Sequence, residues 1–166
     1  MSEEVKEEVV EEKPDVSVER LREQFPDLEF EVSVFRGLTT VVIPKERMLE
    51  VLQFLRDDAA CRFTMLTDIA GIDWSAKGRT PRFEVIYNLN SLDRRVRLRV
   101  KVRVDEGEKL PSAVGIWQAA NWHERECYDM LGIEFEGHPD LRRIFMPDDF
   151  KWFPLRKDFP LKGYGE

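Results

Sequence analysis

The segment from residue 95 to residue 104 constrains the fold of this chain more than any other feature. Basic side chains alternate with apolar ones without a break; the basic residues are Arg95, Arg97, Arg99, Lys101 and Arg103, and the apolar residues are Val96, Leu98, Val100, Val102 and Val104. Successive side chains of a β-strand point to opposite faces of the sheet. The pattern therefore predicts a strand with one buried face and one charged face, so another layer must cover its apolar side.

The rest of the chain supplies candidates for that layer. Capping residues, turn residues and hydrophobic spacing predict helices from Ser17 to Phe25, from Pro44 to about Asp57 and from Pro111 to about Leu131, and strands over residues 30–34, 38–43, 63–74 and 83–89. Gly71 indicates a bulge or a close approach within its strand. This order predicts an α+β fold: a two-layer domain with a mostly antiparallel or mixed sheet packed by helices.

The pattern changes after Gly132, which is expected to end the third helix. No helix or strand period continues, four prolines interrupt the segment, and aromatic residues are frequent, namely Phe135, Phe145, Phe150, Trp152, Phe153, Phe159 and Tyr164. Such apolar surface needs something to lie against. We therefore expect residues 17–132 to form the domain and residues 133–166 to form an extended tail that wraps a partner.

Charge is distributed unevenly along the chain. The net charge is -7, but residues 1–16 hold seven acidic and two basic side chains, and the other residues hold 24 basic and 26 acidic ones. We expect residues 1–16 to be a disordered acidic tail. The nearly neutral body gives no indication of nucleic acid as a general partner.

The chain carries no obvious signature of a secreted or membrane-spanning protein. The chain has two cysteines, Cys61 and Cys127, which are far apart, and this pattern indicates a reducing compartment. Two cysteines cannot supply the four thiolates that an iron–sulfur cluster usually needs. No apolar run is long enough for a transmembrane helix, and the beginning of the chain lacks a signal-peptide pattern. The expectation is a cytosolic chain that works at a membrane only through another subunit.

A cluster of chemically active residue types falls on the predicted third helix. His123 and Cys127 are spaced so that they could share a metal, but two ligands do not make a zinc site. Glu124, Glu126 and Asp129 could serve in acid–base chemistry. We expect Arg125, which is spaced to pair with Asp129, together with Arg142 and Arg143, to hold these acids ionised, as in interface ion pairs. No nucleotide-binding, phosphate-binding or nucleophile motif is present.

The basic strand leaves two interpretations open. Its cations could receive RNA or an acidic protein, or they could form a solvated face or a docking face for a partner subunit. RNA-reading sheets usually carry stacking aromatic residues among the basic ones, and this face has none.

The stretch from Asn121 to Leu161 resembles the signature of the C-type subunit of bacterial respiratory complex I, NADH:quinone oxidoreductase. The resemblance begins with Asn121-Trp122-His123-Glu124-Arg125-Glu126, continues through Tyr128–Ile133 and Phe135–Ile144, and includes Met146–Asp149 and Pro154–Leu161. It implies a two-layer α+β fold and a stand-alone, non-catalytic structural subunit of the peripheral arm on the cytoplasmic side of the inner membrane.

The resemblance also implies partners and roles. The chain would bind no cofactor itself, while the complex uses FMN, iron–sulfur clusters and quinone. It would pack chiefly against the quinone-site subunit, of the D type, and its neighbours of the B and I types. The implied partner-interface residues are Glu124, Arg125, Glu126, Asp129, His138, Arg142, Arg143, Arg156, Lys157 and Asp158. Three alternatives are an equivalent subunit of a related energy-converting hydrogenase or other-donor complex, a free enzyme using the helix carboxylates, and a nucleic-acid-binding module on the basic strand.

Overall fold

A computed structural model describes residues 15–163 of the chain. Its main sheet contains five strands in the order β1-β2-β5-β4-β3, namely β1 (Glu31–Phe35), β2 (Leu38–Ile43), β3 (Met65–Asp73), β4 (Phe83–Ser91) and β5 (Val96–Val104). β2 and β5 are parallel, whereas the other neighbouring pairs are antiparallel. The sheet is therefore mixed, as the sequence predicts.

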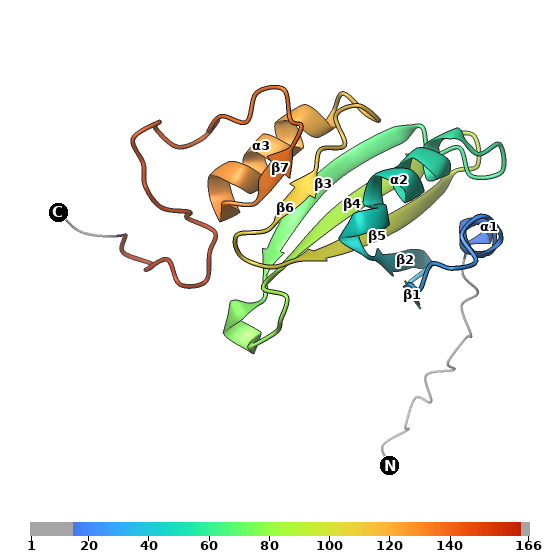
Figure 1. Ribbon diagram of the computed structural model, residues 1–166, viewed down its shortest axis with the longest axis horizontal. Helices are drawn as coiled ribbons and strands as arrows, with labels where there is room; N and C mark the ends of the chain where they lie inside the picture. Colours follow the sequence, from blue (N-terminus) through green and yellow to red (C-terminus); the bar gives the residue numbers. More distant parts are fainter. Residues whose placement is uncertain (1–14, 164–166) are drawn as a thin grey trace, which may run out of the picture.

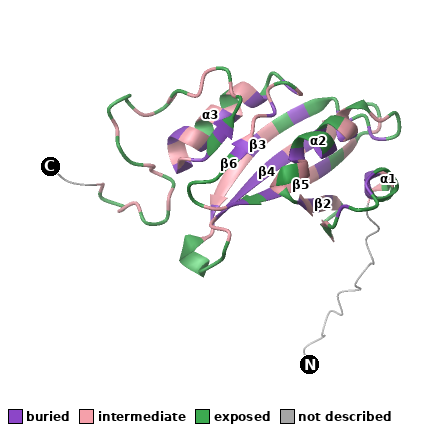
Figure 2. Ribbon diagram, viewed as in Figure 1, coloured by how far each residue is buried: buried purple, intermediate pink, exposed green. Residues whose placement is uncertain are grey.

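Helices cover one face of this sheet (Figure 1). They are α1 (Val16–Gln24), α2 (Met48–Asp57) and α3 (Ala120–Leu131), and short 3₁₀ turns η1 (Lys45–Arg47) and η2 (Ser75–Lys77) lie between elements. From Leu98 to Val102, the apolar residues of β5 lie in register with Val85, Tyr87 and Leu89 of β4 and with Val41 of β2. All of these apolar residues are buried in a single core (Figure 2). The prediction of a two-layer α+β fold is confirmed.

Helix α1 begins slightly earlier than expected, and a different residue caps it. Asp15, not Ser17, is the N-cap: its carboxylate accepts a 2.9 Å hydrogen bond from the Ser17 backbone N–H, and it pairs with Arg94. Ser17 is itself buried. Residues 1–14 of the expected acidic tail lie outside the described residues.

The third helix is shorter than expected. Residues 109–111 form a short strand, β6, which pairs in parallel with β7 (Glu134–Glu136), and the helix begins only at Ala120. Pro111 therefore ends a strand and does not open a helix. The prediction was wrong because the Ser112 N–H donates to the Glu136 carbonyl next to the β6–β7 pair, while the Ser112 hydroxyl and the Ala113 N–H donate to the side chain of Glu124.

Helix α3 lies against β3, and Gly71 permits the contact. A Cβ atom at Gly71 would lie 2.4 Å from Leu131 Cδ1 and 3.3 Å from Ile133 Cδ1. The expected close approach is therefore present, while the register shift of β3 falls between Leu66 and Asp68. Helix α3 ends at Gly132, whose φ of 75° is the left-handed conformation predicted for it.

The segment after β7 forms a wide loop beside α3 (Figure 1). Figure 2 shows it as mainly exposed or half-buried, in contrast to the strands. Between residues 15 and 163, no helix is long and apolar enough to cross a membrane.

Candidate functional site

Glu124 lies in the interior of the domain. Its side chain is fully buried and accepts 2.6 Å hydrogen bonds from Ser112 Oγ and from the Ala113 backbone N–H. Burial raises its pKa to about 7, although both hydrogen bonds act in the opposite direction. The expectation that arginines hold this acid ionised was wrong, because the helix turns Glu124 toward the core and Arg125 toward the surface.

His138 lies close to Glu124. Its Nε2 lies 4.0 Å from Glu124 Oε2, and its side chain is also fully buried. Nδ1 accepts a hydrogen bond from the Asp140 N–H, which places the ring proton on Nε2, where the Asn121 carbonyl accepts it at 3.1 Å. His138 therefore fastens the start of the C-terminal segment to the first turn of α3.

Asp129 fixes a second point of the C-terminal segment. Its fully buried carboxylate accepts a 2.7 Å hydrogen bond from Arg143 and three more from consecutive backbone N–H groups of residues 144–146. Burial alone would raise the pKa of Asp129, but these hydrogen bonds outweigh it and hold the pKa below its usual value. The prediction that Asp129 pairs with Arg125 was wrong; its partner is Arg143.

Arg125 instead binds backbone carbonyl groups. It donates to the carbonyl oxygens of Arg142 and Arg143, at 3.0 and 3.3 Å, and its guanidinium lies 5.0 Å from the ring centre of Trp122. Arg142 is exposed and pairs with Asp140, and Glu126 is exposed on the same helix as Arg125. The arginines and acids of this region thus form separate contacts and do not act as one network.

Asp73, at the end of β3, anchors the far end of the C-terminal segment. Its buried carboxylate binds the guanidinium of Arg82 through two hydrogen bonds and accepts a 2.9 Å hydrogen bond from the Lys157 backbone N–H. Burial alone would raise the pKa of Asp73. Hydrogen bonds from Arg82, from the Lys157 backbone and from the backbone and side chain of Ser75 outweigh burial and hold the pKa well below its usual range. Asp158 also reaches Arg82, at 3.1 Å.

Arg156 locks the same end of the segment to α3. It donates to the Leu131 carbonyl at 2.7 Å and pairs with Glu106, while its guanidinium lies over the rings of Phe83 and Phe153. Five of the predicted interface residues therefore have side chains that are mainly buried and hold the chain's own segments together, namely Glu124, Asp129, His138, Arg143 and Arg156.

This arrangement leaves several large apolar side chains exposed. Phe145, Trp152, Leu155 and Leu161 of the C-terminal segment are 59%, 40%, 55% and 104% exposed, and Trp122 on α3 is 64% exposed. The anchors at Asp129 and Asp73 fix the backbone that presents most of these side chains. The sequence indicated an aromatic tail in need of a partner, but it could not separate the rings that point outward from those that pack on arginines, such as Phe153.

The remaining candidate sites have ordinary structural surroundings. Cys127 is buried, its thiol lies 3.8 Å from the Ile69 carbonyl, and burial raises its pKa to about 12. No group of three or more His, Cys, Asp or Glu side chains within residues 15–163 is placed to hold a metal ion. On the basic strand, Lys101 pairs with Glu84, Arg103 pairs with Glu31, and Arg99 binds Asn88, so residues of other strands satisfy much of that face.

Comparison with known proteins gives consistent matches along the chain. Residues 41–165 match the family described as "Respiratory-chain NADH dehydrogenase, 30 Kd subunit". The C-type subunit 2 of the NADH-quinone oxidoreductase of Rhizobium etli is 45% identical over 91% of this chain and 80% of its own length. The C-type subunit of the corresponding enzyme of Geotalea uraniireducens is 46% identical over 89% of this chain and 88% of its own.

Solved structures share the fold of this chain, and two of them show the degree of likeness. The trypsin-resistant fragment (1–134) of Nqo5 is 37% identical, with a TM-score of 0.64, and the match covers 75% of this chain and 99% of the fragment. A chain of the membrane-bound sulfane sulfur reductase, an archaeal respiratory membrane complex, has a TM-score of 0.72 over 87% of this chain and 84% of its own length. At 24% identity, that likeness concerns the fold alone.

Proposed function

The chain belongs to the 30 kDa subunit family of respiratory-chain NADH dehydrogenases, which includes the C-type subunits of NADH-quinone oxidoreductases, and from this premise we propose that it is a non-catalytic structural subunit. Its role is to hold together the peripheral arm of the complex and to support the subunit that binds quinone. Electron transfer from NADH to quinone, and the coupled movement of protons, take place on other subunits.

The fixed apolar display of the C-terminal segment carries this proposal. Phe145, Leu155 and Leu161 are more than half exposed, on a backbone that Asp129 and Asp73 hold in place. Large apolar side chains on a preorganised backbone are typical anchors of stable interfaces, because little conformational entropy is lost on binding. The Nqo5 relative was solved as a trypsin-resistant fragment, which supports a division between a stable domain and a separate docking segment.

The proposal assigns the cofactors and the partners to the rest of the assembly. FMN, the iron–sulfur clusters and quinone are bound elsewhere in the complex. This chain meets chiefly the D-type, quinone-site subunit, with the B-type and I-type subunits as neighbours, on the cytoplasmic side of the inner membrane. Arg142, Glu126, Lys157 and Asp158 remain the predicted polar contacts of this interface. Their side chains are exposed or pair at the surface, where they can form the polar rim of an interface.

The most direct test changes the apolar display without touching its anchors. Phe145→Ser combined with Leu155→Ser removes two outward side chains, and we expect the amount of intact complex in native membranes to fall several-fold. A matched control is Phe35→Ser combined with Leu92→Ser, which alters side chains that are 71% and 60% exposed elsewhere on the chain. The isolated chain should unfold at the same denaturant concentration in all three forms. Normal assembly of the Phe145/Leu155 variant would disprove the docking role.

Truncation provides a second test, and the structure defines where to cut. Ending the chain at Gly132 would also remove Ile133 and Phe135, which are 2% and 3% exposed core residues. Ending it after Leu141 keeps β7 and the His138 contact, and it removes the loop together with its hydrogen bonds to Asp129, Asp73 and the Leu131 carbonyl. We expect that truncated chain to fold but not to assemble.

Identification of the subunits that co-purify with the full-length chain would also separate an NADH-oxidising complex from a related hydrogenase-type assembly.

A further inference from the structure

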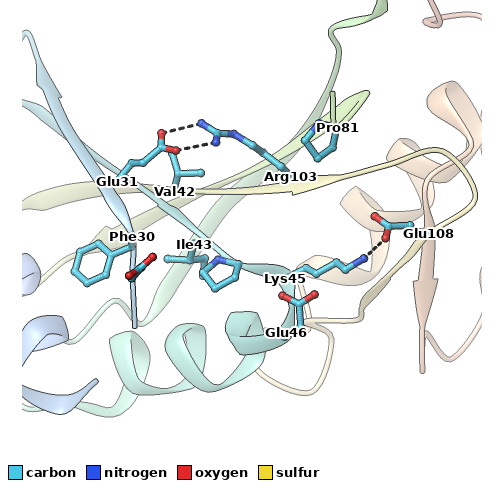
Figure 3. Close-up of a pocket in the computed structure, with 11 residues that line it drawn as sticks. Phe30, Glu31, Val42, Ile43, Lys45, Glu46, Pro81, Arg103 and Glu108 are labelled. Carbon is cyan, nitrogen blue, oxygen red and sulfur yellow. Dashed lines mark hydrogen bonds and ion pairs between the residues drawn. The ribbon is translucent and has the colours of Figure 1, made fainter. Parts of the chain in front are cut away.

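A groove lies beside the start of β1, at the end of β2, and shares no lining residue with the C-terminal segment (Figure 3). Its volume is about 580 Å³, within the range of ordinary ligand pockets. Apolar side chains form part of its lining, namely Phe30, Val42, Ile43, Pro44 and Pro81. These residues come from separate parts of the chain, so the groove exists only in the folded domain.

Two ion pairs hold the walls of the groove in place. Arg103 of β5 binds the carboxylate of Glu31 on β1 through two hydrogen bonds of 2.8 Å, and Lys45 of η1 pairs with Glu108 (Figure 3). The first pair joins two strands that are not neighbours in the sheet, and the second joins residues 63 positions apart. The groove is therefore preformed, and its only two cations are already neutralised.

Two acidic side chains of the groove, Glu29 and Glu46, take no part in these ion pairs. Within the described part of the chain, neither Glu29 nor Glu46 has a hydrogen-bond or ion-pair partner, and both are exposed at the groove. The lining holds four glutamates against Lys45 and Arg103, so its net charge is -2. An apolar floor with unpaired acids at the rim complements a side chain that has a long aliphatic stem and a cationic end.

We propose that this groove receives an extended segment of a neighbouring subunit that carries a lysine or arginine. The stem of that side chain would lie on Phe30 and Pro44, and its charged end would meet Glu29 and Glu46. The N-terminal residues of the chain itself do not fit this role, because residues 1–14 carry six glutamates and only two lysines. A second contact of this kind, separate from the C-terminal segment, fixes the orientation of the chain as well as its attachment.

Crosslinking in the intact complex tests the proposal directly. A photoreactive amino acid in place of Glu46 should form a crosslink to another subunit, in a peptide with a lysine or arginine next to the crosslinked residue. The same amino acid in place of Glu19, an exposed residue of α1 outside the groove, is the control. A crosslink to residues 1–14, to a second copy of the chain or to a peptide without a basic residue would overturn the proposal, as would no crosslink at all.

Charge reversal provides an independent measurement. Glu29→Lys combined with Glu46→Lys should increase loss of this subunit from the purified complex during a salt wash by about tenfold, because cations would then face a cation. Glu19→Lys should leave the loss unchanged. If the groove variant behaves like Glu19→Lys, the proposal fails. That result would leave the docking role of the C-terminal segment intact, because the Phe145/Leu155 variant tests that role separately.

Discussion

Among the buried carboxylates, Glu124 is the one that lacks a cation. Asp73, Glu84 and Asp129 pair with Arg82, Lys101 and Arg143, respectively, whereas no lysine or arginine of residues 15–163 pairs with Glu124. Burial therefore raises the pKa of Glu124 to about 7, while the hydrogen-bonded environments of Asp73 and Asp129 lower theirs. The two kinds of acid respond to pH in opposite directions.

Glu124 should make the chain less stable as the pH rises. Its pKa is about 7 when folded and near the ordinary 4.5 when unfolded, so between these values the folded chain keeps a proton that the unfolded chain releases. The contribution of Glu124 to the free energy of unfolding is therefore largest below pH 4.5. It falls as the pH rises from 4.5 to about 7, by up to about 3 kcal/mol in total. Glu124→Gln should flatten the slope. Urea unfolding of both forms at several pH values measures it, and parallel slopes would contradict the prediction.

Asp129→Asn should loosen the C-terminal segment at its first anchor. The change leaves Arg143, whose side chain is only 11% exposed, without its carboxylate, so we expect a loss of about 3 kcal/mol in the free energy of unfolding. Hydrogen exchange of the backbone amides of residues 144–146 should speed up. Asp140→Asn, which breaks the exposed pair with Arg142, is the control and should cost less than about 1 kcal/mol. Equal effects would show that Asp129 is not a special anchor.

At the scale of the elements, the periodicity of hydrophobic residues predicted the strands and helices whose boundaries depend on local sequence. Every strand of the main sheet, β1 to β5, and the helices α1 and α2 lie close to their predicted ranges, because alternation and helical spacing report directly on a buried face. The start of α3 was not predictable in this way. Only the folded chain brings Glu124 to residues 112 and 113, and that long-range contact outweighs the helix-opening tendency of Pro111.

The same limit applies to the candidate site. The motif identified Asp129, Arg125 and Arg143 as a group of charged residues, but sequence spacing favoured an ion pair within the helix. The actual partner of Asp129 is 14 residues away, beyond a turn and a strand that no periodic pattern predicts. The rotation of α3 against β3 decides which acids are buried. It also decides that Asp129, unlike Glu124, meets the arginine and the backbone N–H groups that lower its pKa.

Gly132→Ala should lower the free energy of unfolding through both backbone strain and a steric clash at the end of α3. The glycine has a φ of 75°, and a Cβ there would lie 2.7 Å from Phe153 and from Arg156. Gly37 has the same φ with no atom within 4 Å of such a Cβ, so Gly37→Ala isolates the backbone cost of about 1–2 kcal/mol. We expect Gly132→Ala to cost about 1–3 kcal/mol more, as measured by denaturant unfolding. Equal costs for the two variants would mean that the C-terminal segment does not pack on this turn.

At the scale of the whole molecule, the exposed loop should be open to protease in the free chain and closed to it in the complex. Arg142 and Lys151 are exposed on this segment, whereas the sheet and helices below it form one core. Limited trypsin treatment of the isolated chain should therefore cut within residues 142–162, and the same bonds in the intact complex should be cut about tenfold more slowly. Mass spectrometry of the fragments measures both rates. Equal rates would show that no partner covers the loop.

The two anchors of the C-terminal segment also make its position depend on the packing of α3 against β3. Asp73 ends β3 and Asp129 lies in α3, and the segment meets both anchors, through Lys157 and residues 144–146 respectively, because α3 packs on β3. A chain that has not completed this packing cannot present Phe145 and Leu155 in their fixed positions. If the segment docks as proposed, attachment to the complex would act as a check on folding: only a correctly folded copy would bind its partners.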